Sequence, residues 1–529
     1  MRPLSGAGVW VFTIDAWARM RCTAAMTNKH WVRALVIMGL LGWGLHLHAD
    51  FQIAPVFSDH MVLQRGQPLT VWGWADDGEK ITVKFRGQQA STTARNGKWS
   101  LRLRRAKVGG PDIFTVSSPT RTVTFTNVLV GEVWICSGQS NMEWPLDRCF
   151  EAADDIAGAT NPMIRLLNVP NRISDAPSVV FKSAWQVCSP ETVKKFSGVG
   201  YYFGRDLHRA RRVPVGLIQS DWGGSPAEAW MSREALEIQP RYQTEILDRY
   251  PTALKDYQAA LAAWEAEKAE AEKAGREFKK WAPWRPWKPS ELYNGMITPL
   301  IPFAIKGVIW YQGESNAGQA EQYRTLFPDM IRCWRRDWGQ NDFPFLLVQL
   351  APFKAIKDQP DESDWAELRE AQLLATQALP HVGMAVITDV GDPKDIHPTK
   401  KQPVGERLAL AARALAYGEK ITFSGPIYRS QRIEGNKVIL NFDHVGRGLE
   451  ARDGALKGFA VCGADRRFVW ATAEIVGDTV VVSSPQVPQP VAVRYGWADC
   501  PVVNLWNKDG LPASPFRTDD FPLITAPKN

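Results

Sequence analysis

The pattern of hydrophobic and polar positions divides the chain into regions that predict different architectures. Short segments that alternate hydrophobic with polar residues, or are rich in β-forming residues, occur at residues 69–74, 80–85, 98–103 and 121–125. Gly, Asp and Asn residues separate them, as expected for strands joined by turns. Evenly spaced short strands of this kind predict a β-sandwich-like domain over residues 50–128.

The pattern changes between residues 129 and 420. Hydrophobic runs that end in small polar loops lie at residues 215–220, 305–310, 345–349 and 384–388, and helical segments such as 366–379 and 405–416 lie between them. This alternation predicts an α/β domain with a parallel sheet and helices on both faces. Ligands of such sheets bind at the carboxyl ends of the strands, so polar residues that follow the strands are candidates for function.

An insertion interrupts this domain at about residues 240–285. Residues 259–268 favour a helix and are charged or polar on most faces, which predicts a solvated helical hairpin that serves as a lid or edge. Trp281, Trp284 and Trp287 follow among prolines. They could border a sugar-binding cleft, or they could fix the hairpin to the rest of the protein.

The two ends of the chain carry different signals. Residues 437–442, 479–482 and 490–495 predict a β-rich, sandwich-like domain over residues 421–529.

Residues 1–49 predict a signal peptide region with Met26 as the expected true start, because a basic segment precedes a short apolar run and Ala49 offers a cleavage site. An exported protein, periplasmic or secreted, without a stable membrane span after cleavage, is therefore expected. The alternative is an uncleaved anchor.

Composition narrows the class of partner. The formal charge is +7, and residues 1–49 contribute +4 of it, so the remaining chain carries only about +3 and no basic tract. Nucleic acid is therefore not an expected partner. The seven cysteines include no CxxC pair, and we expect neither a metal nor a cofactor. Cys136 or Cys149 could pair with Cys188, and Cys462 with Cys500, or all could be buried free thiols.

Histidines are scarce, which limits the candidates for a general base. Five follow residue 49, and His397 alone combines a position after an expected core strand with nearby aspartates, at Asp389, Asp392 and Asp395. A nearby carboxylate fixes the tautomer of a histidine and stabilises its protonated form. Ser140, in a Gly-x-Ser turn after another expected strand, is the candidate nucleophile, although this turn is common and lacks the second glycine of the α/β-hydrolase elbow.

Acyl transfer also needs donors for a developing oxyanion. The candidates are the backbone amide of Ser140, the flexible loop at Gly223 and Gly224, and the side-chain amide of Asn316. Each has an ordinary structural explanation, a plain turn for the glycines and a loop cap for Asn316. Their common position after core strands favours the functional interpretation.

Four ordered segments, at residues 131–142, 222–230, 310–317 and 389–398, resemble the motifs of the sialate O-acetylesterase family, which belongs to the SGNH superfamily of serine esterases. The resemblance extends over essentially the whole chain after residue 50. It implies an SGNH-type parallel sheet with Ser140 as nucleophile and His397 as base. It also implies Gly223 or Gly224 and Asn316 as oxyanion donors.

The resemblance leaves two points open. Many relatives place the triad aspartate three residues before the histidine, where this chain has Lys394, so the acid is Asp395, slightly favoured, or Asp392. Substrate-binding residues are expected within the same motifs: they are Gln139, Gln312 and Glu314, of which Glu314 is expected mainly to order its loop.

The sequence thus predicts an exported serine esterase that removes O-acetyl groups from carbohydrate through an acetyl-serine intermediate. The family resemblance implies O-acetylated sialic acid as the substrate, and acetylated xylan or another plant glycan is the alternative. Two other interpretations compete: a non-catalytic carbohydrate-binding protein that uses the β-rich domains and the 23 tryptophans, and a glycoside hydrolase that uses Glu314 and Asp392.

Overall fold

A single long strand, β8 (Thr122–Gly138), belongs to two parts of the protein in the computed structural model, which describes residues 50–527. Its first half pairs antiparallel with β7 (Gly109–Ser117). Its second half pairs parallel with β11 (Val215–Asp221) and β12 (Gly307–Tyr311). The expected boundary between residues 128 and 129 therefore falls inside this strand.

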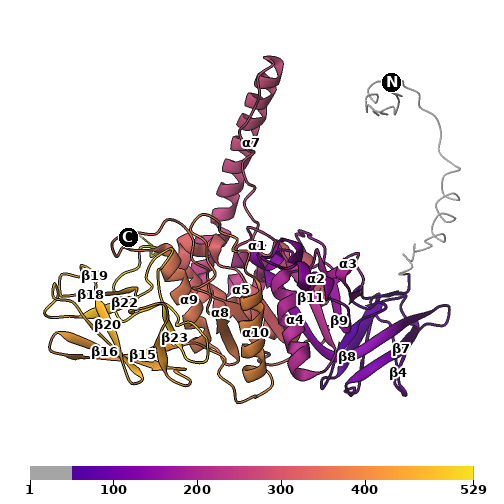
Figure 1. Cartoon of the computed structure of the whole chain (residues 1–529). Coiled ribbons are helices and arrows are strands. Elements are labelled where there is room, and N and C mark those ends of the chain that lie inside the picture. The colour runs from indigo at the N-terminus through magenta and orange to yellow at the C-terminus, as the bar shows by residue number, and fades with distance from the viewer. Residues whose placement is uncertain (1–49, 528–529) are drawn as a thin grey trace, which may run out of the picture. The chain divides into compact units, whose positions relative to one another are not determined.

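The N-terminal region is β-rich, as its alternating pattern predicts. Strands β3 (Leu69–Trp74), β4 (Lys80–Phe85) and β6 (Lys98–Leu103) have the predicted bounds. The remaining strands are β1 (Gln52–Ile53), β2 (Val62–Gln64) and β5 (Gln88–Thr93). Strands β1, β3 and β6 form one sheet, and β4, β5 and β7 continue from β8. Figure 1 shows these strands in indigo beside the central region.

The central sheet has the strand order β10-β9-β11-β8-β12-β13-β14. Its outer members are β9 (Asn161–Asn168), β10 (Gln186–Cys188), β13 (Phe345–Val348) and β14 (Val382–Ala385). All neighbouring pairs are parallel except β10 with β9. The last strand begins and ends earlier than predicted, because residues 386–388 leave the sheet in the loop that leads toward His397.

Helices cover both faces of this sheet. Alternate residues of β8 belong to different hydrophobic clusters: Val133 and Ile135 to one, Trp134 and Cys136 to the other. The first cluster includes residues of α8 (Ala320–Trp338) and α9 (Asp364–Ala378), and the second includes residues of α4 (Gly198–Arg211) and α10 (Gln402–Leu415). Strands buried on both faces explain why their sequences are continuously hydrophobic.

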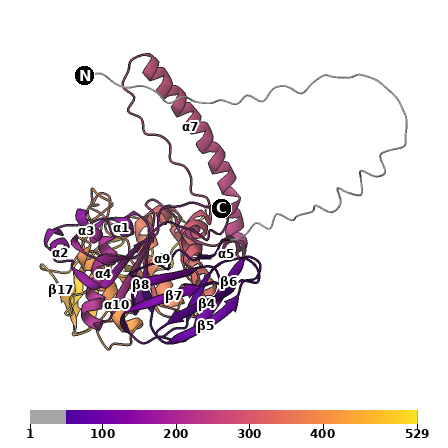
Figure 2. The same cartoon turned by 90° about the vertical axis from the view of Figure 1, so that its right-hand side faces the viewer.

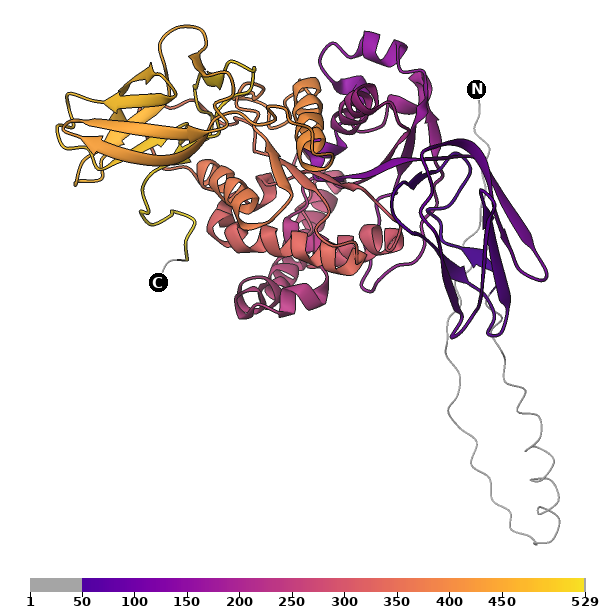
Figure 3. The same cartoon turned by 90° about the horizontal axis from the view of Figure 1, so that it is seen from below.

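The C-terminal region is again β-rich. One antiparallel sheet has the order β15-β16-β21-β20 and another the order β19-β18-β22-β24, while β17 pairs with β23. Their bounds are Ile427–Glu434, Lys437–Asp443, Leu449–Ala451, Phe459–Cys462, Val469–Trp470, Thr472–Val476, Thr479–Ser483, Ala492–Tyr495, Leu505–Asn507 and Phe516–Arg517 for β15 to β24. Residues from all three sheets share one hydrophobic cluster. Figure 3 shows this region and the N-terminal strands on opposite sides of the central helices.

The insertion is a single long helix and not the predicted helical hairpin. Helix α7 (Arg249–Lys273) projects from the central region, and the chain returns beside it without a second helix or strand (Figure 2). Pro283, Pro286 and Pro289 lie in the return segment. Proline has no N–H for the helical bond and clashes with the preceding turn, which explains why only one arm is helical.

Five short α-helices complete the description of residues 50–527. They are α1 (Ser140–Glu143), α2 (Ala153–Ala157), α3 (Pro190–Val193), α5 (Arg233–Glu237) and α6 (Pro240–Tyr242).

Three further expectations concern the thiols and the export signal. The six cysteines of the described part are buried and unpaired, so the disulfide alternative is wrong there. None of the helices in residues 50–527 is long and apolar enough to cross a membrane. The predicted signal peptide, residues 1–49, lies outside the described residues.

Candidate active site

The turn that presents Ser140 depends on a glycine. Strand β8 ends at Gly138, whose φ of 138° is a conformation that side chains disfavour. A Cβ at Gly138 would also lie 2.2 Å from the backbone oxygen of Tyr311 on the neighbouring strand β12. The chain can therefore leave the sheet here, and Ser140 becomes the first residue of α1.

Ser140 and His397 meet although 257 positions separate them. The Nε2 atom of His397 lies 2.9 Å from the Oγ of Ser140. On the other side of the ring, Nδ1 lies 3.5 Å from Oδ1 of Asp395, an ion-pair distance. The same carboxylate accepts a 2.8 Å hydrogen bond from the backbone N–H of His397. Serine, histidine and aspartate are thus arranged in the order that nucleophilic catalysis uses.

The other two aspartates of this loop have different partners. Asp392 is exposed and accepts a hydrogen bond from the backbone N–H of Lys394. Asp389 binds Arg407 through both carboxylate oxygens, at 2.6 and 2.7 Å. Asp395 is therefore the aspartate that faces the imidazole.

The orientation and the pKa of the His397 imidazole depend on neighbouring side chains. The imidazole stacks on Trp144 with 5.3 Å between ring centroids and 17° between ring planes. Partial burial, together with the positive charge of Lys401, holds the pKa of His397 below its ordinary value, and the charge of Asp395 opposes this shift. A lowered pKa keeps the ring neutral, and so able to accept a proton, at neutral pH.

Two of the predicted oxyanion donors are the backbone N–H groups of Ser140 and Gly223. The N–H of Ser140 opens α1 and so has no intrahelical partner. The N–H of Gly223 donates a 2.7 Å bond to Glu143, and a Cβ at Gly223 would lie 3.2 Å from the Cβ of Ser140. Gly224 follows with a φ of 73°. The N–H of Gly223 therefore binds a negative oxygen close to the serine.

Asn316 is buried in a network of its own. Its Oδ1 accepts bonds from the N–H of Ala227 and from Gln312, and its Nδ2 donates a 3.0 Å bond to Glu228. Burial raises the pKa of Glu228. One hydrogen of the Asn316 amide remains after the bond to Glu228, since an amide nitrogen has two.

The three expected substrate-binding residues are Gln139, directly before Ser140, and Gln312 and Glu314 in the loop after β12, and none of them is among the residues that line the cleft. Gln139 accepts bonds from the N–H groups of Gly313 and Ser315. Gln312 is fully buried, and its side chain bonds Asn316 and other groups. These contacts order the loop after β12, and contact of Gln139, Gln312 or Glu314 with substrate stays a prediction.

A buried charged network under the serine escaped the sequence analysis. The Nζ of Lys401 donates a 2.5 Å bond to Oδ1 of Asn141, and Nδ2 of Asn141 donates a 2.6 Å bond to Glu314. Burial lowers the pKa of Lys401 to about 7 and raises that of Glu314. The ammonium also lies 5.1 Å from the centre of the Tyr311 ring. The position of Asn141 directly after Ser140 was the only hint in the sequence.

Ser140 and His397 line a cleft of about 560 Å³ at the carboxyl ends of the strands. Its other lining residues include Glu143, Trp144, Arg148, Lys195 and Asp221. Burial, reinforced by the nearby charge of Glu143, raises the pKa of Asp221 well above its usual range. The cleft thus combines the reactive pair with polar groups on its walls.

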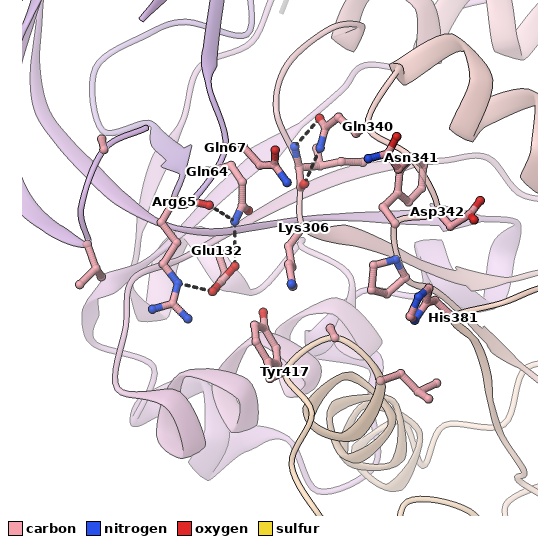
Figure 4. Close-up of a pocket in the computed structure, with 18 of the residues that line it drawn as sticks. Gln64, Arg65, Gln67, Glu132, Lys306, Gln340, Asn341, Asp342, His381 and Tyr417 are labelled. Atoms are coloured by element: carbon pink, nitrogen blue, oxygen red, sulfur yellow. Dashed lines mark hydrogen bonds and ion pairs between the residues drawn. The ribbon is translucent and has the colours of Figure 1, made fainter. Parts of the chain in front are cut away.

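A larger cavity, of about 940 Å³, lies at the opposite end of the strands and is lined by residues such as Glu132, Lys306 and Tyr417 (Figure 4). It contains neither Ser140 nor His397. Its most buried charge, Glu132, is already paired with Arg65. The smaller cleft is therefore the candidate active site.

Comparison with known proteins identifies the family. The sequence profile described as "Carbohydrate esterase, sialic acid-specific acetylesterase" matches residues 130–268 and 269–414. The sialate O-acetylesterases of Pongo abelii and Homo sapiens are each 31% identical over 88% of this chain and 92% of their own length. A carbohydrate acetylesterase from Xanthomonas citri is 41% identical, and its solved structure matches with a TM-score of 0.77 over 89% of this chain and all of its own.

The mixed α/β fold, the site and these relatives together define a carboxylic ester hydrolase. This result favours the esterase over a non-catalytic sugar-binding protein or a glycoside hydrolase, and carbohydrate O-deacetylation is the reaction that the relatives support. More specifically, the chain belongs to the carbohydrate esterase family of sialic acid-specific acetylesterases.

Proposed function

We propose that this protein is an exported serine esterase that removes O-acetyl groups from carbohydrate through an acetyl-serine intermediate. The observation that carries this proposal is the 2.9 Å contact between Ser140 Oγ and His397 Nε2 in a cleft at the carboxyl end of the sheet. A serine hydroxyl is a weak nucleophile at neutral pH and needs such a base.

In the first half of the reaction, His397 takes the hydroxyl proton of Ser140 while Oγ attacks the acetyl carbonyl carbon. Asp395 stabilises the imidazolium that forms. The tetrahedral intermediate collapses when the bond to the sugar oxygen breaks, and the imidazolium gives its proton to that oxygen. The deacetylated sugar hydroxyl leaves, and the acetyl group remains on Ser140.

The oxyanion is held by the N–H groups of Ser140 and Gly223, with the free amide hydrogen of Asn316 as a third donor. The N–H of Gly223 already binds the carboxylate of Glu143, so this carboxylate gives way when the substrate oxygen arrives. Donors of this kind typically contribute about 10²–10³ in rate each.

Water completes the cycle. His397 takes a proton from water, the water oxygen attacks the acetyl carbonyl, and the second tetrahedral intermediate expels Ser140 Oγ. The imidazolium returns its proton to Oγ, and acetate leaves. Both halves use the same base and the same oxyanion donors.

The test is a comparison of the parent enzyme with Ser140→Ala. We expect the variant to lose about four to six orders of magnitude in acetate release from p-nitrophenyl acetate. The parent, but not the variant, should be labelled by a serine-reactive fluorophosphonate. Substantial turnover by Ser140→Ala would exclude the mechanism.

O-acetylated sialic acid is the proposed substrate, and an acetylated plant glycan such as xylan is the alternative. Arg148 and Lys195 line the cleft, and Lys195 pairs with Asp147 at 2.6 Å. Arg148 makes no ion pair within residues 50–527. Its guanidinium lies over the ring of Trp144, 6.0 Å from the ring centre, and a guanidinium without a carboxylate partner suits the carboxylate of an acidic sugar. Acetate release from O-acetyl sialic acid and from acetylated xylan, measured side by side, decides between them.

Export and domain organisation complete the proposal. We infer cleavage before Asp50, with Met26 as the start of translation, because residues 26–49 have the pattern of a signal peptide. N-terminal sequencing of the protein from cell fractions tests this and separates periplasm from medium. The SGNH-type central domain at residues 129–420 and the sandwich-like domains at residues 50–128 and 421–529 are part of the same proposal.

A further inference from the structure

The return segment of the insertion contains a short repeat. Residues 281–289 are three consecutive Trp-X-Pro triplets, which place Trp281, Trp284 and Trp287 three positions apart. The segment has neither helix nor strand. Prolines at this spacing favour the polyproline II conformation, which has three residues per turn and a rise of about 3.1 Å per residue. Side chains three apart then share one face, about 9 Å from one another.

The outer two tryptophans face solvent. Trp281 is 91% exposed and Trp284 is 89% exposed, whereas Trp470, the next most exposed tryptophan of the described part, is 43% exposed. Large aromatic side chains usually bury most of their surface, and a row of exposed ones marks a binding surface. Folding of the chain onto itself therefore does not account for these two side chains.

The segment is held in place by its other residues. Arg285 binds Glu291 through two hydrogen bonds, and Lys288 forms an ion pair with Asp175. Farther out, the indole N–H of Trp264 on α7 donates to the carbonyl of Lys280. Such anchoring, with the stiffness of the prolines, reduces the entropy that the exposed rings would lose on binding a ligand.

The row ends at the candidate active site. The indole N–H of Trp287 donates a 2.8 Å bond to the carbonyl of Gly224, and its ring packs edge-on against Trp222 at 5.2 Å. Gly223 lies between Trp222 and Gly224 in the chain, and a Cβ built on it would lie 3.2 Å from the Cβ of Ser140. The exposed rings are therefore joined along the chain to Trp287, which contacts the Gly223–Gly224 loop beside Ser140.

We propose that Trp281, Trp284 and Trp287 form a track that binds an extended glycan chain, several sugars long, and leads it toward Ser140. This inference rests on the proposed function. Flat aromatic rings bind the apolar C–H faces of sugar rings, and the expected spacing is close to that of alternate sugars in an extended chain. The favoured substrate is thus an acetyl group on an oligo- or polysaccharide and not on a free monosaccharide.

The test uses the full chain with Ser140→Ala, so that substrate is bound without turnover. Isothermal titration with xylan, glucomannan and polysialic acid gives the affinity of this protein and of the same protein with Trp281→Ala and Trp284→Ala. We expect at least one glycan to bind and the double substitution to weaken that binding about tenfold or more. Trp470→Ala, which removes an exposed tryptophan elsewhere, is the matched control and should change the affinity less than twofold.

Other outcomes would overturn the track. They are binding of none of the three glycans, equal binding by the double variant, or a dimer of the parent that dissociates in the double variant on sedimentation, which would make the row a self-association surface. Failure of the track is distinguishable from failure of the esterase function, because loss of p-nitrophenyl acetate turnover on Ser140→Ala does not depend on glycan binding.

Discussion

The side-chain amide of Asn141 donates a 3.0 Å hydrogen bond to the backbone carbonyl of Ile396. Asn141 follows Ser140, and Ile396 precedes His397. One hydrogen bond thus joins the two loops whose separation sets the distance between nucleophile and base. The reactive contact is therefore supported by a hydrogen bond from a side chain that is itself fully buried.

Removal of this support should slow the enzyme without removing any reacting group. For Asn141→Ala we expect kcat on p-nitrophenyl acetate to fall about ten- to a hundredfold, because small misplacements of reacting groups cost rates of this order. The free energy of unfolding should fall by about 1–3 kcal/mol, because Lys401 loses its buried acceptor. Asn436→Ala, in an exposed turn, is the control. An unchanged kcat would show that the loops hold their positions without Asn141.

Lys401 should shift the pH dependence of the reaction. The base must be neutral, so kcat/KM rises with pH through the pKa of His397 and then levels off. The charge of Lys401 lowers that pKa, and Asp395 raises it. Lys401→Met removes the lowering charge, so the acidic limb should move to higher pH. Lys400→Met, at the exposed neighbouring position, is the control and should leave the acidic limb of the pH profile in place. Identical pH profiles for the two variants would contradict an effect of the Lys401 charge on the pKa of His397.

The two aspartate candidates should differ in their effect on catalysis. Asp395 faces the imidazole at 3.5 Å but is half exposed, so Asp395→Asn should lower kcat about ten- to a hundredfold, less than loss of a buried triad acid would. Asp392→Asn should lower it less than threefold, because the carboxylate of Asp392 accepts a bond from the N–H of Lys394 and does not face the imidazole. Steady-state kinetics on p-nitrophenyl acetate measure both. The reverse order would assign the triad acid to Asp392.

Arg148 should discriminate between the two substrate classes. If an acidic sugar is the substrate, Arg148→Ala should raise KM for O-acetyl sialic acid about tenfold or more, since a hydrogen bond to a charged group contributes about 1.5–3 kcal/mol. KM for acetylated xylan should not change. Arg429→Ala, on the C-terminal strand β15, controls for the loss of a surface charge. Equal effects on both substrates would argue against carboxylate recognition at this position.

Gly138 should be intolerant of any side chain. Gly138→Ala places a Cβ against the carbonyl of Tyr311 and forces a φ of 138° on alanine, so we expect a loss of at least about 3 kcal/mol in unfolding free energy, or little folded protein. A Cβ at Gly318 would meet nothing within 4 Å, and Gly318→Ala should cost less than about 0.5 kcal/mol. Denaturant unfolding of both variants measures the difference.

The sequence predicted those features that depend on local pattern. Three N-terminal strands match their alternating segments in full, and the positions of Ser140 and His397 after core strands anticipated their contact. The buried network was not predictable, because a lysine such as Lys401 has no local sign of burial. Its surroundings, among them Asn141, Trp144 and Tyr311, come from distant parts of the chain. The choice between Asp395 and Asp392 depended on the path of an irregular loop.

The insertion shows where composition misleads. Its alanine, glutamate and lysine residues predicted a helical hairpin, and the arm with the prolines has neither helix nor strand. The pairing of cysteines was likewise open, since it depends on distances across the core that spacing along the chain does not determine.

The shared strand β8 has a consequence for anyone who wishes to trim this protein. Its first residues belong to the N-terminal sheet, and its last residues deliver Ser140. A fragment that starts after residue 128 would keep the half of β8 that pairs with β11 and β12, but it would lose β2, which pairs with residues 129–131. It would also expose hydrophobic residues of the central region that share a buried cluster with the N-terminal strands. Removal of the first domain should therefore destabilise the part of the protein that carries Ser140.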